Sequence, residues 1–310
     1  MFPNPKVSIV IPTYNEENDI LQTLNYLDSL EYEDYEIIIV DDSNDSTPQI
    51  IKSFESNKIN YFKPKLRSGR CEARNIGIKM SKGEIIIILN ADVLLPKNFI
   101  NQILIHYKRG ADYVLVDSSV NNLSSYYARY IDCQHKFERY FTKKSKKWMW
   151  TEGFSIRKDK LMQTNLFPSG YIVPIVAGED ARFGQELINL NFNRVLDLDI
   201  IVTHNSPSSF EEFWRIRKGR GQGTPQIRCF LDNWSLNKIL FYEIIKLTYR
   251  IFSFVLIIPN LMSSIKWAFM SPKRYRVIDL FRFFYCKLIE DAATSYGALT
   301  MLKKIRQLKR

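Results

Sequence analysis

Three short polar segments follow apolar runs in the first third of the chain, and their residue types could hold a phosphate through a metal ion. They are Thr13-Tyr14-Asn15-Glu16, Asp41-Asp42 and Asn90-Ala91-Asp92. Short apolar runs are typical of buried parallel strands, whose carboxyl ends meet at the sheet edge where ligands bind. Carboxylates gathered there repel one another unless a cation or hydrogen-bond donors hold them. A single aspartate is more simply a helix cap, but three aligned strand ends predict a ligand site.

A phosphate at this edge would need something other than a glycine cradle. The sequence has no G-x-G-x-x-G motif after its first strand and no G-x-x-x-x-G-K-[ST] motif anywhere. This argues against a dinucleotide-binding Rossmann enzyme and against a P-loop ATPase. A divalent cation and basic side chains are therefore expected to hold any diphosphate.

Strands and helices alternate through the first 120 residues, which predicts a mostly parallel sheet with flanking helices. The expected strands are residues 7–11, 36–40, 60–62, 84–89 and 112–116, and helices are expected at 16–30, from 47, at 72–81 and at 96–108. Further along, an aromatic-faced helix is expected within 121–150, a mobile basic loop at 143–150 and a helix at 180–189. The fold class is α/β and Rossmann-like.

The positive charge of the chain is concentrated at its C-terminal end. Residues 241–310 contain 13 Lys or Arg and 4 Asp or Glu, a net charge of +9 out of +11 for the chain. Because the same region is rich in Phe, Tyr, Ile and Leu, it indicates an anionic membrane surface rather than a nucleic acid.

An uncharged stretch of 15 residues, 251–265, lies within this region and is interrupted by Pro259-Asn260. It is shorter than the roughly 20 apolar residues that a spanning helix needs. We therefore expect a monotopic, interfacial helical hairpin over 236–270, ahead of a packed soluble helix or a spanning one.

The four cysteines are far apart in the sequence and form no C-x-x-C pair, so neither a zinc site nor a disulfide framework is indicated. Reduced thiols in a cytosolic compartment are expected. The N-terminus enters a strand almost at once, and we expect no signal peptide.

Taken together, four motifs resemble those of the family 2 inverting glycosyltransferases, which have the glycosyltransferase-A fold. The motifs are Val7-Ser8-Ile9-Val10-Ile11-Pro12-Thr13-Tyr14-Asn15-Glu16, Val40-Asp41-Asp42-Ser43, Ala73-Arg74-Asn75-Ile76-Gly77 and Leu89-Asn90-Ala91-Asp92. Their order matches over residues 6–120, and the similarity continues through Gly178–Phe183 to about residue 224. It implies a catalytic domain at 1–230, followed by a basic, helical and membrane-associated region at 231–310.

The resemblance implies a nucleoside-diphosphate sugar, with UDP the favoured nucleotide. The residues implied to line it are Pro12, Thr13, Tyr14, Glu16, Asp42, Arg70, Arg74, Asn90, Ala91 and Asp92. Asp42 would accept a hydrogen bond from the base. Residues 210–222 are expected to be a helix or a loop rich in Arg and Gly. Within the segment 214–223, Arg217 and Arg220 would contact the departing diphosphate if the segment closes over it as a loop, and a solvated basic loop is the plainer alternative.

The cofactor implied is Mn²⁺ or Mg²⁺, with Asp92 and His204 as its protein ligands. Asn90 departs from the D-x-D pattern of the family. An amide oxygen can still contact ribose or a metal shell, so we expect Asn90→Asp to keep or tighten Mn²⁺ dependence and Asp92→Asn to abolish turnover.

Asp180 corresponds to the catalytic base of the family. Inversion at an anomeric carbon is one in-line displacement, in which a carboxylate takes the proton of the acceptor hydroxyl. Gly178 would leave room for the acceptor, Glu179 would raise the pKa of Asp180, and Glu152 would lie on the acceptor side. A helix N-terminus that favours acids is the plainer interpretation of Glu179-Asp180.

The favoured hypothesis is a metal-dependent transferase at the cytoplasmic face of the cell membrane, peripheral, monotopic or integral, acting on a glycan or lipid-linked acceptor. Two alternatives remain open: a polyprenyl- or dolichyl-phosphate glycosyl synthase, and an inactive transferase-like membrane scaffold. No nucleic-acid partner is expected.

Overall fold

The computed structural model describes residues 5–141 and 152–309, so the predicted basic loop at 143–150 lies outside the described residues. The chain forms two compact units. The first contains residues 1–119, 149–170 and 179–204, and the second contains residues 120–148, 171–178 and 205–310. This division differs from a boundary at residue 230, because the helices at 126–141 and 210–226 pack with the C-terminal helices.

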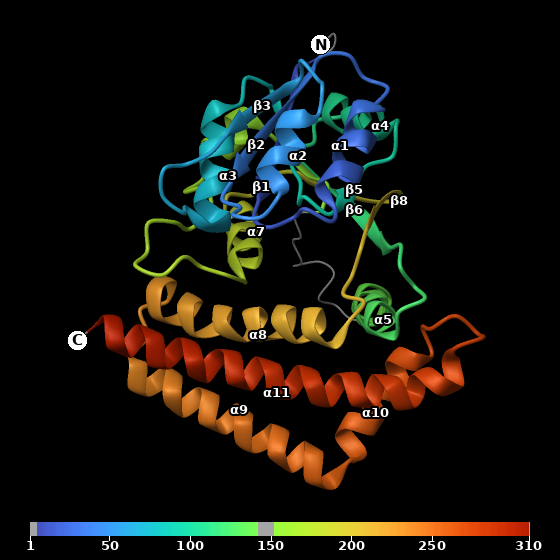
Figure 1. Cartoon of the computed structure of the whole chain (residues 1–310), viewed down its shortest axis with the longest axis vertical. Helices are drawn as coiled ribbons and strands as arrows, with labels where there is room; N and C mark the ends of the chain where they lie inside the picture. The colour runs from blue at the N-terminus through green and yellow to red at the C-terminus, as the bar shows by residue number, and fades with distance from the viewer. Residues whose placement is uncertain (1–4, 142–151, 310) are drawn as a thin grey trace. The chain divides into compact units, whose positions relative to one another are not determined.

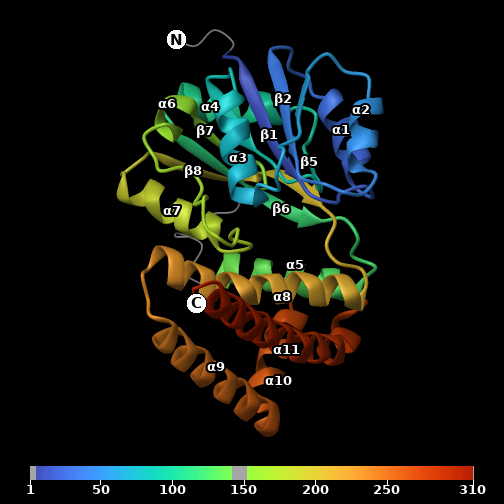
Figure 2. The same cartoon turned by 60° about the vertical axis from the view of Figure 1, so that its left-hand side comes forward.

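The first unit is built on an eight-stranded sheet with the order β3-β2-β1-β4-β7-β6-β8-β5. Its strands are β1 (Val7–Thr13), β2 (Tyr35–Asp41), β3 (Ile59–Phe62), β4 (Ile85–Ile88), β5 (Val93–Leu94), β6 (Tyr113–Val120), β7 (Phe154–Arg157) and β8 (Arg194–His204). Its helices are α1 (Ile20–Asp28), α2 (Thr47–Ser53), α3 (Gly69–Met80), α4 (Phe99–Lys108), α6 (Lys158–Leu161) and α7 (Glu179–Asn189). Figures 1 and 2 show these helices around the sheet.

The sheet is mixed rather than mostly parallel. Strands β3, β2, β1 and β4 are mutually parallel, as their β-α-β order predicts. Strand β7 pairs antiparallel with both β4 and β6, and β5 pairs antiparallel with β8. The predicted strand at 112–116 therefore exists as β6, but in the antiparallel half.

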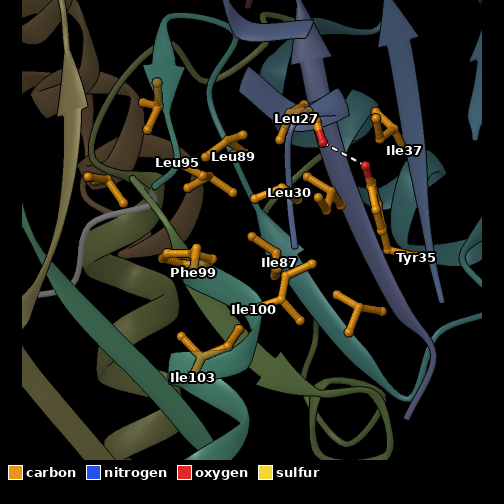
Figure 3. Close-up of a cluster of buried hydrophobic side chains, with 14 of the residues drawn as sticks. Leu27, Leu30, Tyr35, Ile37, Ile87, Leu89, Leu95, Phe99, Ile100 and Ile103 are labelled. Atoms are coloured by element: carbon orange, nitrogen blue, oxygen red, sulfur yellow. Dashed lines mark hydrogen bonds between the residues drawn. The ribbon is translucent and has the colours of Figure 1, made fainter. Parts of the chain in front are cut away.

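Both faces of the parallel half are covered, which explains its uninterrupted apolar runs. Alternate residues of β1, β2 and β4, such as Ile9, Ile37 and Ile87, pack against α1 and α4. Figure 3 shows this cluster, where the Tyr35 hydroxyl also donates to the Leu27 carbonyl at 2.6 Å. On the other face Ile38 and Val40 pack against α3.

Helix α3 approaches the sheet so closely that its Gly77 cannot be replaced without movement. A Cβ at this position would overlap the side chain of Val10. The glycine of the A-R-N-I-G motif therefore sets how near α3, with Arg70 and Arg74, lies to the strand ends.

The second unit is helical. It contains α5 (Tyr126–Phe141), α8 (Phe210–Gln226), a π-helical turn η2 (Ile227–Leu231), α9 (Leu236–Leu256), α10 (Ile258–Ala268) and α11 (Arg276–Leu308). Helices α8 and α11 lie side by side in both views (Figures 1 and 2). Tyr130, Phe213 and Phe283 form an aromatic core between α5, α8 and α11.

Candidate active site

Two loops at the carboxyl edge of the parallel strands are joined by hydrogen bonds. The Asn15 amide donates to Ser43 Oγ at 2.8 Å, and the Glu16 amide donates to Thr47 Oγ1 at 2.8 Å. Asn15 has a φ of 58°, a left-handed conformation that asparagine tolerates better than most residues. The loop after β1, with the predicted residues Tyr14 and Glu16, is thereby fixed beside the loop after β2.

The two adjacent aspartates after β2 have different partners. Asp41 is buried and accepts hydrogen bonds from the Thr13 hydroxyl and the Tyr61 hydroxyl, both at 2.8 Å. Asp42 accepts from the Gly69 amide at 2.7 Å and from the amide and hydroxyl of Ser68. The Asp42 carboxylate therefore binds the N-terminus of α3, where the helix dipole favours negative charge, and its contact with a base stays a prediction.

Arg67 and Ser68 belong to a loop that the sequence analysis did not select. The guanidinium of Arg67 lies 3.9 Å from the ring centroid of Tyr14, an exposed side chain at the predicted base site. The signal for this loop was available in its composition, because residues 63–68 contain three cations directly before Gly69. We add Arg67 to the candidate nucleotide residues, since Arg and Tyr can both stack on a base.

Arg74 connects the strand end after β4 to the start of α7. Its Nη1 donates to Glu179 Oε1 at 2.9 Å and its Nη2 donates to Asn90 Oδ1 at 3.2 Å. Arg70, 55% exposed, lies 3.5 Å from the same Glu179 oxygen. Burial alone would raise the pKa of Glu179, but Arg74 and then Arg70 lower it, so Glu179 is anionic. Asn90 is thus held in the site by Arg74.

Asp180 follows Glu179 in the first turn of α7. Burial raises the pKa of Asp180 to about 6, and the negative charge of Glu179 contributes to the increase. One carboxylate oxygen accepts a hydrogen bond from the Ala181 amide at 2.8 Å. The two neighbouring acids thus have opposite pKa shifts, a difference typical of acid–base sites.

Strand pairing brings Asp92 and His204 together from positions more than one hundred residues apart. Val93 is the register partner of His204 in the antiparallel pair β5–β8, so Asp92 directly precedes the residue opposite His204. Burial raises the pKa of Asp92, and the nearby His204 only partly offsets this effect. The charge of Glu152 raises the pKa of both Asp92 and Asp180, which places Glu152 near both.

These side chains fit a divalent cation that also binds a diphosphate, but they do not form a closed site by themselves. Within residues 5–141 and 152–309 no group of three His, Cys, Asp or Glu side chains is arranged to hold a metal. The negative charge of the half-buried Glu152 raises the pKa of the half-buried Asp92 and Asp180, and a cation would relieve this repulsion. Asp92 and His204 provide an oxygen and a nitrogen donor, and phosphate oxygens can complete such a shell.

The predicted role of Arg217 is corrected by the structure. Residues 214–223 are not a loop but part of α8, and the Arg217 side chain is 1% exposed. Its Nη1 lies 3.1 Å from Glu290 Oε1 and its Nη2 donates to Gln134 Oε1 at 2.9 Å. The guanidinium is therefore held inside the helical unit and is not available to a diphosphate.

Gly221 of this segment and Gly297 of α11 are packing residues. A Cβ on Gly221 would overlap the backbone of Thr294, and a Cβ on Gly297 would overlap the backbone of Lys218. The small residues thus let α8 and α11 cross closely. Arg220 is exposed on α8, and its contact with a diphosphate stays a prediction.

Pro12, Ala91 and Gly178 are the remaining predicted site residues, and their backbone positions are defined. Pro12 is half-buried in β1 opposite Val40, and Ala91 is buried, its carbonyl accepting from Thr23 Oγ1 at 2.6 Å. Gly178, with a φ of 89°, directly precedes α7 and has a conformation that favours glycine. Their substrate contacts stay predictions.

Comparison with known proteins identifies a family and a set of relatives. The family model described as "Glycosyl transferase family 2" matches residues 8–168. Glycosyltransferase MJ1057 of Methanocaldococcus jannaschii is 22% identical over 276 residues, covering 84% of this chain and 92% of its own length. GlyG of Streptococcus pneumoniae is 31% identical over 97 residues, which are 30% of this chain and only 32% of GlyG.

Solved structures show the same fold over nearly the whole chain. The mannosyltransferase PcManGT of Pyrobaculum calidifontis, solved with GDP-Man and Mn²⁺, has a TM-score of 0.65 at 17% identity, covering 98% of this chain and 88% of PcManGT. Residues 1–349 of Staphylococcus aureus TarS, solved with UDP-GlcNAc, have a TM-score of 0.54 at 16% identity, with coverages of 97% and 92%. The mixed α/β fold is therefore the glycosyltransferase-A fold.

Proposed function

The chain belongs to glycosyl transferase family 2, and from this premise we propose that it is a metal-dependent, inverting transferase that moves a sugar from a nucleoside diphosphate to a hydroxyl acceptor. The observation that carries the proposal is the environment of Asp180. A carboxylate with a pKa of about 6 lies near Glu152, whose charge also acts on the Asp92–His204 pair.

In the proposed reaction Asp180 accepts the proton of the acceptor hydroxyl. The acceptor oxygen forms a bond to the anomeric carbon while the bond from that carbon to the diphosphate oxygen breaks, and the nucleoside diphosphate leaves with the electron pair. A base whose pKa is close to the working pH combines availability with proton affinity. Arg74 and Glu179 hold the first turn of α7, and with it Asp180, in place.

Asp92 and His204 are the residues that would hold Mn²⁺ or Mg²⁺. Such a cation neutralises the charge that develops on a leaving diphosphate. The Mn²⁺ bound with GDP-Man in PcManGT supports the use of a divalent cation. The inactive-scaffold alternative rested on Asn90, and the hydrogen bond that Asn90 accepts from Arg74 supports a role for this residue within the site instead.

We propose a UDP-sugar as donor, with Asp42 reading the base and Arg67 and Tyr14 near it. UDP-GlcNAc bound to TarS supports a uridine nucleotide, and GDP-Man bound to PcManGT keeps a guanosine nucleotide open. The test is a thermal-shift and turnover screen of UDP-, GDP- and dTDP-sugars with Mn²⁺, Mg²⁺ and EDTA. Stabilisation and nucleotide release that require a divalent ion are expected, and no response to any donor with either ion contradicts the proposal.

We propose a glycan or lipid-linked acceptor presented at the cytoplasmic face of a membrane. The concentration of basic and apolar residues in 241–310 supports this location. A lipid carrying a free phosphate would be an anionic acceptor that needs little base catalysis, so the synthase alternative differs in its dependence on Asp180.

A further inference from the structure

Helices α9 and α10 have their amphipathic character reversed relative to a water-soluble helix. On α10 the buried positions are Asn260, Ser264 and Ala268, which are polar or small. On α9 the buried positions include Glu243 and Ser253. In water such residues normally face outward and the large apolar ones inward.

Most of the large apolar side chains of α9 and α10 are exposed. Around the junction of α9 and α10 the exposed fractions are 58% for Phe252, 59% for Phe254, 67% for Val255 and 63% for Ile258. We call residues 251–262 the apolar corner. Exposed apolar surface on this scale marks an interaction site rather than ordinary protein surface.

Two polar residues on the inner side of α10, Asn260 and Ser264, have internal partners. Asn260 Nδ2 donates to the Ser253 carbonyl at 3.3 Å, and Ser264 Oγ donates to the Asn260 carbonyl at 2.8 Å. Backbone groups near the helix break are thereby satisfied without water. This is a requirement for irregular backbone that enters an apolar medium.

The charges that flank the apolar corner have one sign at the surface. Over residues 236–285 the acids are Glu243 and Asp279, and both are buried and paired with cations, Glu243 with Lys246 at 3.2 Å and Asp279 with Arg129 at 2.7 Å. The exposed charged residues of this range are Lys238, Lys266, Lys273 and Arg274. The surface around the corner is therefore complementary to an anionic partner.

The bend limits how deep the corner can reach. No single helix in the described part of the chain has the length and hydropathy to cross a membrane, and α9 and α10 meet these criteria only as a pair bent by 82°. Figure 1 shows this bend, which occurs at Ile257 with a φ of 60°. At 1.5 Å per residue the corner extends only about 12 Å beyond Lys266, less than half of the roughly 30 Å hydrocarbon core.

We propose that the apolar corner inserts into one leaflet of an anionic lipid bilayer, with Lys266, Lys273 and Arg274 at the level of the headgroups. The proposed acceptor at the membrane explains why such insertion would be useful. The insertion itself is inferred from the exposed surface of the helical unit and does not depend on that acceptor. The proposal is more specific than a membrane-associated region at 231–310: it names the inserted segment, limits its depth to one leaflet and places the flanking cations at the headgroups.

The first experiment measures sedimentation of the full chain with two kinds of vesicle. One contains phosphatidylcholine alone, and the other also contains about 30% phosphatidylglycerol, an anionic lipid that attracts basic surfaces. Binding is expected only with the anionic vesicles and should weaken with salt. The double change Phe254→Asp with Ile258→Asp should reduce binding at least about tenfold, because both side chains leave an apolar medium. Ile105→Asp, at an exposed apolar position on α4, is the control outside the apolar corner and should bind normally.

The second experiment measures depth. All four native cysteines are buried, so a cysteine introduced at Ile258 can be labelled selectively with an environment-sensitive fluorophore. Blue-shifted emission and quenching by acyl-chain nitroxide lipids are expected for a probe at Ile258→Cys and not for one at Ile105→Cys. Emission at position 258 that is unchanged by vesicles overturns the insertion.

The other occupant, a second copy of this chain, has a different signature. Two results together would overturn the membrane proposal. The unmodified chain would form a dimer in analytical ultracentrifugation that Phe254→Asp with Ile258→Asp dissociates, and it would not bind vesicles. Circular dichroism and thermal melting of each variant verify folding. Release of nucleotide from a donor sugar in the absence of lipid tests the transferase activity separately. A variant that loses vesicle binding but retains nucleotide release supports insertion of the apolar corner. If the unmodified chain releases no nucleotide, the proposed activity fails, and the vesicle experiment still tests insertion.

Discussion

The guanidinium of Arg74 lies 2.9 Å from the carboxylate of Glu179, and both side chains are buried. This ion pair joins α3, which follows the nucleotide loops, to the first turn of α7, which carries Asp180. Because Arg74 also donates to Asn90, one side chain connects the strand end after β4 with the residue next to the proposed base. The arrangement predicts that the two halves of the site are mechanically coupled.

Replacement of Glu179 by glutamine should destabilise the chain by about 3 kcal/mol, because it leaves the buried Arg74 charge without a counterion. Chemical denaturation monitored by circular dichroism measures the change. Glu55→Gln removes an exposed carboxylate and is the matched control, with an expected effect below about 0.5 kcal/mol. Equal stabilities for the two variants would show that the Arg74–Glu179 pair does not stabilise the fold.

The pH–rate profile should have an acidic limb near pH 6. Asp180 acts only as a carboxylate, and its pKa is about 6, so the rate should fall about tenfold per pH unit below that value and level off above it. In Glu179→Gln the negative neighbour is lost, the pKa of Asp180 falls, and the limb should move to lower pH. A limb that stays in place in this variant would show that another group titrates.

The ionisation of Asp180 affects stability in the opposite direction: the rate should rise with pH, whereas the stability of the folded chain should fall. The folded pKa of Asp180 lies above the ordinary value of 3.8, so the folded chain binds more protons than the unfolded chain between pH 3.8 and about 6. Stability from this group is therefore present at low pH and declines as pH rises through that window. Asp180→Asn should raise the melting temperature at pH 7, while Asp159→Asn, an exposed change, should not.

The metal assignment is tested by matched changes at the N-A-D segment. Asp92→Asn should abolish divalent-ion-dependent turnover, and His204→Ala should weaken Mn²⁺ binding, because each removes a proposed ligand. Asn90→Asp should retain turnover and keep or tighten Mn²⁺ dependence, since its neighbour Arg74 can accommodate a carboxylate. Mn²⁺ titrations followed by electron paramagnetic resonance provide a readout independent of activity, and equal losses at positions 90 and 92 would contradict the assignment.

Arg217 and Arg220 should now behave differently. Arg217→Met should lower stability by about 2 kcal/mol, since it removes the ion pair with the half-buried Glu290 and the hydrogen bond to Gln134, with little effect on the KM for the donor. Arg220→Met should leave stability within about 0.5 kcal/mol, and a raised KM would support the predicted diphosphate contact. A raised KM for Arg217→Met at unchanged stability would restore the original role of that residue.

Local sequence patterns were sufficient to predict the parallel half of the sheet, and the motifs were sufficient to identify the family. Apolar runs with polar ends placed Asp42 and Asp92 correctly at strand ends, and the elements from Val7 to Lys108 lie near their expected ranges. The same reasoning did not predict the short strand β5 or its antiparallel pairing with β8. Such a pairing joins distant segments and leaves no periodic signal, although it is what brings His204 to Asp92.

The misinterpretation of residues 214–223 has a different cause. Glycine and arginine in alternation are common in phosphate-binding loops, and that composition favoured a loop. In this chain Gly221 admits the backbone of α11, and Arg217 balances the charge of the half-buried Glu290. Both roles depend on a partner helix about seventy residues away, which no local pattern identifies.

The central claim is that Asp180 takes the proton from the acceptor hydroxyl, and Asp180→Asn tests it most directly. The measurement is kcat together with the Kd of the donor that the nucleotide-sugar screen selects, with and without acceptor. We predict that kcat falls by about 10² to 10⁴ while the donor Kd stays within about threefold, because the change removes the base and not a donor contact. Turnover close to that of the unmodified chain would contradict the account and favour an acceptor that is already an anionic phosphate.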